Sequence, residues 1–260
     1  MLIFSIVIAG IALVTLYGYP MLLQQQTSAD EKIMEKNMIV LQNDIKSLAY
    51  KMVPYQETSL KIGGGPLTVY NSSYNSSSGL PSSTLEINDG TTSGSYLPFP
   101  YNLGTAKFTP GELRYESVSA QTDISLQNGA VVLRPRVQSG STMLAEPRWF
   151  FDASTNTMVI NLIEITSTNI LAKEGIGTVQ MVLEGDPYYS ETLVPSGQSV
   201  YLIYTPDTTQ DYSVAWDNYI MNQNTWTKVP FSPGHYKFTN TGSSDMTLVI
   251  KIFKVEIKSI

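Results

Sequence analysis

The start of the chain, from Met1 to Leu23, is an apolar run without a charged side chain (MLIFSIVIAGIALVTLYGYPMLL), and the first charged residue is Asp30. A helix over this run would be roughly 35 Å long, which is enough to cross the hydrocarbon core of a bilayer. Water is a poor solvent for so apolar a helix, so we expect it to lie in a membrane or in a polymer. The side chains expected to pack there are Leu2, Ile3, Phe4, Ile6, Val7, Ile8, Ile11, Leu13, Val14, Leu16, Leu22 and Leu23.

Two residues interrupt this run, Gly18 and Pro20. Proline lacks a backbone N–H group and clashes with the preceding turn, which predicts a kink or a short unwound stretch near residues 17–20. A membrane helix that tolerates proline is the alternative.

Three interpretations fit an uncharged apolar N-terminus. A signal peptide has a basic region before its apolar core, whereas the nearest basic residue here is Lys32. A membrane anchor usually carries basic residues on its cytoplasmic flank, and that flank is also missing. We favour the third interpretation, in which a basic leader preceded Met1 and was removed.

A second apolar pattern follows the polar Gln24, Gln25 and Gln26. Apolar residues recur there at alternating spacings of four and three, as in an amphipathic helix, and Pro54 marks the end of the pattern. The stripe consists of Met34, Met38, Leu41, Ile45, Leu48 and Met52. It predicts a helix that packs on its own domain, a helix whose other faces meet neighbouring subunits, or both.

Beyond Pro54, short β-prone runs alternate with turn residues, which is typical of a β-sandwich or barrel. Lys61–Gly65 predicts a hinge before a strand that ends at Tyr70. Further strands are expected at residues 84–87, 111–118, 122–126, 130–137, 148–152, 157–165, 177–184, 188–193, 199–205, 235–239 and 246–258, and a short helix within 208–222. The chain therefore predicts the α+β class, with a long helix over residues 1–54 and a mainly antiparallel, β-sandwich-like domain over residues 55–260. A division into two lobes near residues 170–177 is the alternative to a single domain.

The composition narrows the possible functions. Charged residues make up 15% of the chain and the net charge is −6, so we expect no nucleic-acid partner. The absence of cysteine excludes disulfides and thiol chemistry. The only histidine, His235, follows a Pro-Gly turn, and no nucleophile elbow, calcium loop or phosphate loop occurs. We expect neither enzymatic activity nor a metal or other cofactor.

Two N-glycosylation sequons lie in a Ser/Asn-rich segment, at Asn71 and Asn75. Each is an acceptor if the protein is exported. Chance occurrence in a serine-rich loop is the alternative.

The layout resembles the mature archaeal type IV pilins and archaellins: an uncharged apolar N-terminus, an amphipathic continuation, and a cysteine-free, β-rich remainder. The helical match covers about the first fifth of the chain. The rest of the chain is similar only in being β-rich and in having a surface of Ser, Thr, Asn and Tyr. Bacterial type IV pilins typically have a glutamate where this chain has Ser5, and a disulfide near the C-terminus. Both are missing here, which favours an archaeal relative.

The resemblance implies a structural subunit of an extracellular filament, inserted in the membrane before assembly. Identical subunits would polymerise through the N-terminal helix, and the outer domain would serve adhesion or surface attachment and carry any N-linked glycans. The alternative is a non-polymerising cell-surface protein with an uncleaved anchor and a β-rich binding domain.

Overall fold

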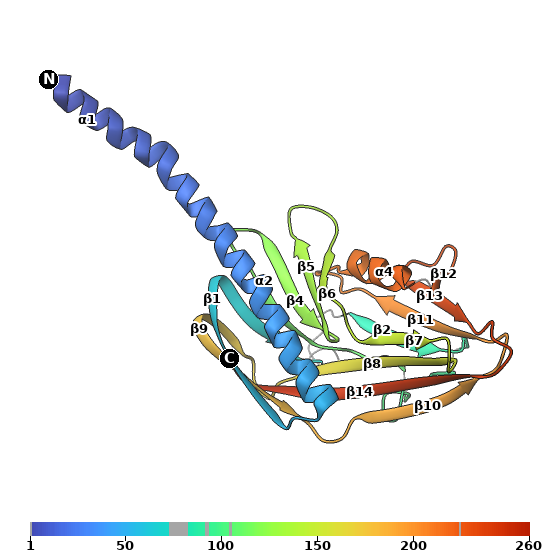
Figure 1. Ribbon diagram of the computed structural model, residues 1–260. Coiled ribbons are helices and arrows are strands. Elements are labelled where there is room, and N and C mark those ends of the chain that lie inside the picture. The colour runs from blue at the N-terminus through green and yellow to red at the C-terminus, as the bar shows by residue number, and fades with distance from the viewer. Residues whose placement is uncertain (1, 73–82, 92–93, 104–105, 224) are drawn as a thin grey trace.

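The computed structural model describes residues 2–72, 83–91, 94–103, 106–223 and 225–260. A long helix precedes a β-rich domain (Figure 1), which confirms the predicted α+β class. The helix consists of α1 (Leu2–Leu13), the π-helical segment η1 (Val14–Gly18) and α2 (Tyr19–Lys51). The N-terminal half of this helix projects away from the domain, and its C-terminal half lies along the domain (Figure 1). We call the apolar first part of the helix, residues 2–23, the rod.

The domain contains a large sheet of ten strands and a small sheet of four. The large sheet has the order β6-β5-β4-β3-β1-β9-β14-β8-β7, and β10 also pairs with β14. Its strands are β1 (Tyr55–Tyr70), β3 (Glu112–Glu116), β4 (Thr122–Gln127), β5 (Ala130–Pro135), β6 (Thr142–Ala145), β7 (Trp149–Asp152), β8 (Thr157–Thr166), β9 (Ala172–Leu183), β10 (Tyr188–Val194) and β14 (Met246–Ser259). The small sheet has the order β12 (Thr227–Lys228), β13 (His235–Thr239), β11 (Ser199–Thr205) and β2 (Thr84–Asn88). Among the described strands, β8 and β14 form the parallel pair and the other pairs are antiparallel.

The large sheet is the middle layer of the domain. One face packs against the small sheet and helix α4 (Ser213–Asn222), and the other face packs against α2. Along β8, Ile160 and Leu162 enter the first core, whereas Ile163 and Ile165 enter the second. Because both faces are covered there, this strand is buried from Ile160 to Thr166.

Helix α2 is held on the sheet by the predicted apolar stripe. Five of its residues are fully buried in the second core: Met34, Met38, Leu41, Ile45 and Leu48. The side chain of Gln42 adds polar contacts, because its Nε2 donates hydrogen bonds to the carbonyl oxygens of Gly129 (2.7 Å) and Glu146 (3.0 Å). The direction of the rod relative to the domain is therefore fixed by both packing and hydrogen bonds.

The sixth predicted stripe residue, Met52, does not belong to this surface. The helix ends at Lys51, and Met52 has the left-handed conformation (φ 54°) with a side chain that is 45% exposed. The chain must reverse here to begin β1 at Tyr55, and a left-handed residue after the last helical turn is a common way to do so. The spacing pattern extended the stripe one step too far.

The glycines at positions 63–65 lie inside β1, not in the predicted hinge before a strand. A Cβ atom on Gly65 would lie 2.0 Å from the carbonyl oxygen of Glu116, and one on Gly63 would lie 2.8 Å from Oδ1 of Asp30. These glycines therefore allow β1 to approach both β3 and α2 closely. The pairing of β1 with β9 is irregular at the same place, between Ile62 and Leu67.

The structure also contains two short strands that were not predicted and one strand that is longer than predicted. Strands β6 and β12 were not expected, and β9 begins at Ala172, earlier than the predicted residue 177. As a result, residues 172–177 lie within a strand of the large sheet that pairs with both β1 and β14.

Replacing a buried stripe residue should destabilise the domain. We expect Met38→Ala to lower the free energy of unfolding by about 2–5 kcal/mol, because the substitution leaves a cavity between α2 and the large sheet. Val40→Ala, at a side chain that is 47% exposed, should change it by no more than about 0.5 kcal/mol. Denaturant titration of the full chain in a mild detergent measures both values. Equal losses in the two variants would contradict the docking described here.

Alkaline pH should unfold the domain. Burial raises the pKa of Tyr204, Tyr212, Tyr219 and Tyr236 above the usual tyrosine value. The folded state therefore binds these phenolic protons more tightly than the unfolded state. Their contribution to the free energy of unfolding is complete below about pH 10 and is lost as the pH rises further. We expect part of the tyrosinate absorbance to appear only together with loss of the near-ultraviolet circular dichroism. Complete titration of the tyrosines in the folded protein would argue against this burial.

Candidate functional site

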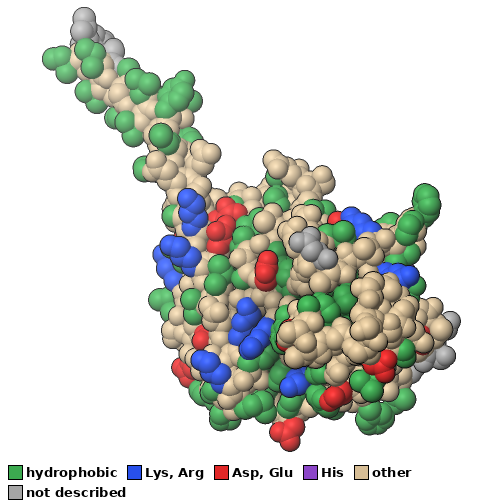
Figure 2. All heavy atoms as spheres, turned by 45° about the vertical axis from the view of Figure 1, so that its right-hand side comes forward, with side chains coloured by type: hydrophobic (Ala, Val, Ile, Leu, Met, Phe, Trp, Pro, Cys, Tyr) green, Lys and Arg blue, Asp and Glu red, His purple; other side chains and the backbone are tan. Residues whose placement is uncertain are grey.

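The projecting part of the rod is an exposed apolar surface. Figure 2 shows apolar side chains along it, with charged side chains beginning only near the domain. Apart from Leu2, whose side chain lies outside the described residues, each predicted packing residue is exposed: Ile3, Phe4, Ile6, Val7, Ile8, Ile11, Leu13, Val14, Leu16, Leu22 and Leu23. This surface is not covered by any described part of its own chain.

The rod is apolar on all sides. Ile6, Val7 and Ile8 point in directions about 100° apart and are 63%, 53% and 51% exposed. A helix without a polar face is found in a membrane or inside a larger assembly. Moving one such side chain out of water stabilises the buried state by about 1.5–3 kcal/mol.

The described chain has one helix long and apolar enough to cross a membrane, Ile6–Lys51, and none of its most apolar window is buried. Its position near the N-terminus is one that signal sequences share. Length and composition thus suit either membrane insertion or export.

Gly18 and Pro20 do not break the helix. The segment Val14–Gly18 is π-helical, and the backbone N–H of Tyr19 donates to the carbonyl oxygen of Val14. Proline cannot donate to the carbonyl oxygen four residues earlier, and the wider π turn lets the rod continue into α2. The predicted unwound stretch is therefore absent, and the rod stays helical through this segment.

Apolar exposure continues along the part of α2 that lies on the domain. Ile33 and Val40 are 39% and 47% exposed and lie seven residues apart, about two helical turns. They are separate from the buried stripe, so α2 packs on its own domain and still presents apolar side chains to its surroundings.

The sequon residue Asn71 lies directly after β1. Its side chain is half-buried, and its Nδ2 atom, to which a glycan would attach, donates a hydrogen bond to the carbonyl oxygen of Ser167. Asn75 lies outside the described residues.

The described residues contain no group of three or more His, Asp or Glu side chains placed to hold a metal ion. His235 is half-buried at the start of β13, and its backbone pairs with Ile203 of β11.

Sequence reasoning missed a hollow beside the C-terminal end of α2. Its lining includes Tyr50 of α2, Arg148 just before β7, Tyr189 of β10 and Lys251 of β14. The sixteen tyrosines of the chain were the only signal in the sequence, because residues so far apart along the chain leave no local spacing pattern.

Comparisons with known proteins link the rod to the domain. A family model described as a family of unknown function (DUF7289) matches residues 1–258, which include both parts. A search of curated proteins and a search of solved structures each found no match. The apolar rod is therefore a feature of the family's model together with the β-rich domain.

Proposed function

The chain belongs to the DUF7289 family of unknown function, and we propose that it is the structural subunit of an extracellular filament of the type IV pilus kind. The observation that carries this proposal is a rod that is apolar on every side, exposed, and continuous with a helix docked on the domain. Such a surface needs a covering that the described part of its own chain does not provide.

Two environments can cover the rod in turn. In the membrane, lipid surrounds Ile3 to Leu23 before assembly. In the filament, rods of identical subunits surround one another, so each apolar side chain stays out of water. The transfer exchanges one apolar environment for another, so close packing between helices has to favour the polymer.

The docking of α2 explains how copies would assemble with one geometry. Buried side chains and Gln42 hold the helix in a single orientation on the large sheet. When identical subunits use the same two surfaces head to tail, the result is a ring or an open helical polymer. A bundle of parallel rods favours the open polymer.

In this proposal, the β-rich domain faces outward and serves adhesion or surface attachment, without enzymatic activity or a cofactor. Its low charge content and hydroxyl-rich composition suit contact with external surfaces. Any N-linked glycans at the sequons Asn71 and Asn75 would belong to this domain. Ser5 and the lack of cysteine favour an archaeal type of subunit.

The exposed rod also favours a second candidate, a membrane-anchored surface protein that does not polymerise. The two candidates differ in the final location of the rod, because the rod of an anchored protein would remain in lipid. Shearing of intact cells separates the two, since filaments are released whereas an anchored protein sediments with membranes.

Removal of the rod should abolish polymerisation. We expect a chain without residues 1–26 to be soluble, with the β-rich domain folded, and absent from sheared filaments. Ile11→Lys should have the same effect on filaments, because a charge within an apolar bundle is not solvated. Electron microscopy and immunoblotting of sheared material measure both.

The matched control is Gln25→Lys, which adds the same charge in the polar stretch where a lysine side chain can reach water. We expect this variant to form normal filaments. Polymerisation of the truncated chain would rule out a core built from the rod. Retention of the wild-type protein in membranes, with no sheared fibres, would favour the anchored protein.

A further inference from the structure

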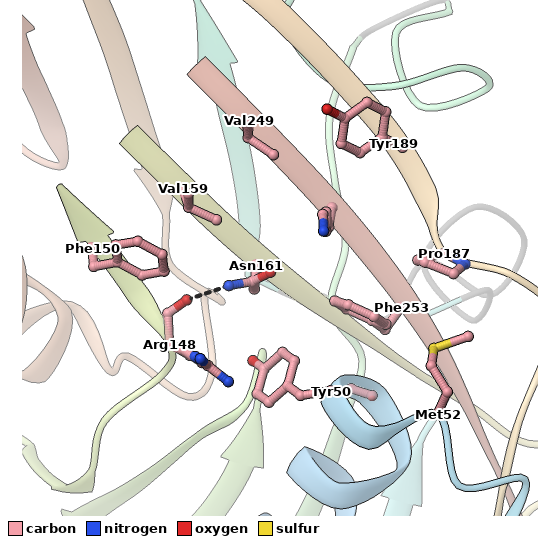
Figure 3. Close-up of a pocket in the computed structure, with 12 residues that line it drawn as sticks. Tyr50, Met52, Arg148, Phe150, Val159, Asn161, Pro187, Tyr189, Val249 and Phe253 are labelled. Carbon is pink, nitrogen blue, oxygen red and sulfur yellow. Dashed lines mark hydrogen bonds between the residues drawn. The ribbon is translucent and has the colours of Figure 1, made fainter. Parts of the chain in front are cut away.

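The end of α2 leaves part of the large sheet uncovered. The helix stops at Lys51, whereas the section formed by β7, β8, β14 and β10 continues beyond it (Figure 1). An open hollow of about 510 Å³ lies between the end of the helix and this section (Figure 3). Its size is within the range of roughly 300–1,000 Å³ typical of small-molecule sites.

Strand register arranges the hollow in two neighbouring rows across these strands. The polar row contains Arg148, Asn161, Lys251 and Tyr189. The apolar row contains Phe150, Val159 and Val249. At the end of α2, Tyr50 packs edge-on against Phe253, with ring centroids 5.4 Å apart. The hollow therefore combines cations and aromatic rings.

The two cations of the hollow lie beside tyrosine rings. The guanidinium carbon of Arg148 is 5.0 Å from the centre of the Tyr50 ring, and Nζ of Lys251 is 5.7 Å from that of Tyr189. Neither forms an ion pair within the described chain, and the described lining of the hollow contains no carboxylate. The nearest acidic group on β10, Glu191, accepts a hydrogen bond from the Tyr189 hydroxyl.

Positive charge extends into an adjoining hollow of about 750 Å³. It shares Tyr50 and Arg148 with the first and is lined also by Lys46 and Lys51. The carboxylate on its described lining belongs to Glu146, whose backbone carbonyl accepts a hydrogen bond from Lys46 (2.9 Å). An acidic chain of net charge −6 thus gathers cations at the end of α2.

We propose that this hollow binds a carboxylated saccharide, with the carboxylate between Arg148 and Lys251 and a sugar ring on an aromatic face. Guanidinium and ammonium groups bind carboxylates through charge-assisted hydrogen bonds. Phe150 and Tyr189, which are 45% and 52% exposed, offer apolar faces for the C–H side of a pyranose. Asn161 donates a hydrogen bond from Nδ2 to the Arg148 carbonyl oxygen (2.8 Å) and so ties the Arg148 segment to β8.

An acidic peptide fits this hollow less well than a saccharide does. Extended peptides bind sheets mainly by pairing with the backbone of an edge strand. Here β8 pairs with β7 and β14, and β14 pairs with β8 and β10, so the backbone of the two central strands under the hollow is paired on both sides, and among the described strands of this section only β7 and β10, at its margins, have a free edge. A ligand of the hollow is therefore recognised mainly by side chains, which suits a sugar better than a peptide.

A lipid headgroup is also disfavoured. Tyr50 lies 27 residues beyond Leu23 on the same continuous helix, a rise of roughly 40 Å. The hollow is therefore remote from the segment that enters a membrane. That the saccharide comes from outside the cell rests on the proposed function, whereas the recognition chemistry does not.

Calorimetric titration of the full chain in an uncharged detergent with trigalacturonate tests the site. We expect saturable binding that weakens with added salt, and a loss of affinity of about tenfold or more in Arg148→Gln and in Lys251→Gln. Maltotriose, which has no charge, should bind far more weakly.

The chain provides a matched control in Lys237, whose Nζ lies 5.8 Å from the centre of the Tyr201 ring on the small sheet. Lys237→Gln removes a similar lysine–tyrosine pair outside the hollow and should leave binding unchanged. Thermal unfolding of each variant shows whether the fold is retained, and if Arg148→Gln is unstable, Lys251→Gln decides.

Absence of trigalacturonate binding, or unchanged binding in Lys251→Gln, would overturn the proposal. Equal or tighter binding of a capped triglutamate peptide, which carries the same charge, would replace the saccharide with an acidic peptide. The titration requires no filament, so a failure here leaves the filament proposal standing, and missing filaments would leave a positive titration valid.

Discussion

The docking of α2 on the large sheet is the contact on which the rest of the structure depends. One continuous helix supplies both the buried stripe, from Met34 to Leu48, and the exposed apolar rod. Because the stripe has no freedom on the sheet, the rod leaves the domain in one direction. A loosely tethered apolar segment would insert in lipid equally well, but it would not impose a common orientation on identical copies.

The large sheet allows this arrangement because different elements pack on its two faces. The small sheet and α4 bury one face, so the domain has a core that does not involve the rod. Helix α2 covers only part of the other face, because it ends at Lys51. The uncovered remainder is where Arg148, Lys251 and the exposed rings meet. The helix that orients the rod thus also defines the limits of the hollow.

The distribution of charge divides the molecule into an uncharged rod and an acidic domain with a local cluster of cations. The rod has no charge, and its surroundings must be apolar. The domain is acidic overall, yet cations collect where α2 ends. Apolar association and charge-assisted recognition are therefore placed roughly 40 Å apart along one helix, so a ligand at the hollow need not disturb packing along the rod.

Runs and periodicities among neighbouring residues were enough to predict the rod, the apolar stripe from Met34 to Leu48, and most strands. The packed fold was needed to show that Met52 leaves the stripe, that Gly63 and Gly65 allow close approach to β1, and how the hollow is assembled. These features depend on contacts between segments far apart in the chain. Strand register and the point where α2 ends set those contacts, and neither leaves a pattern in consecutive residues.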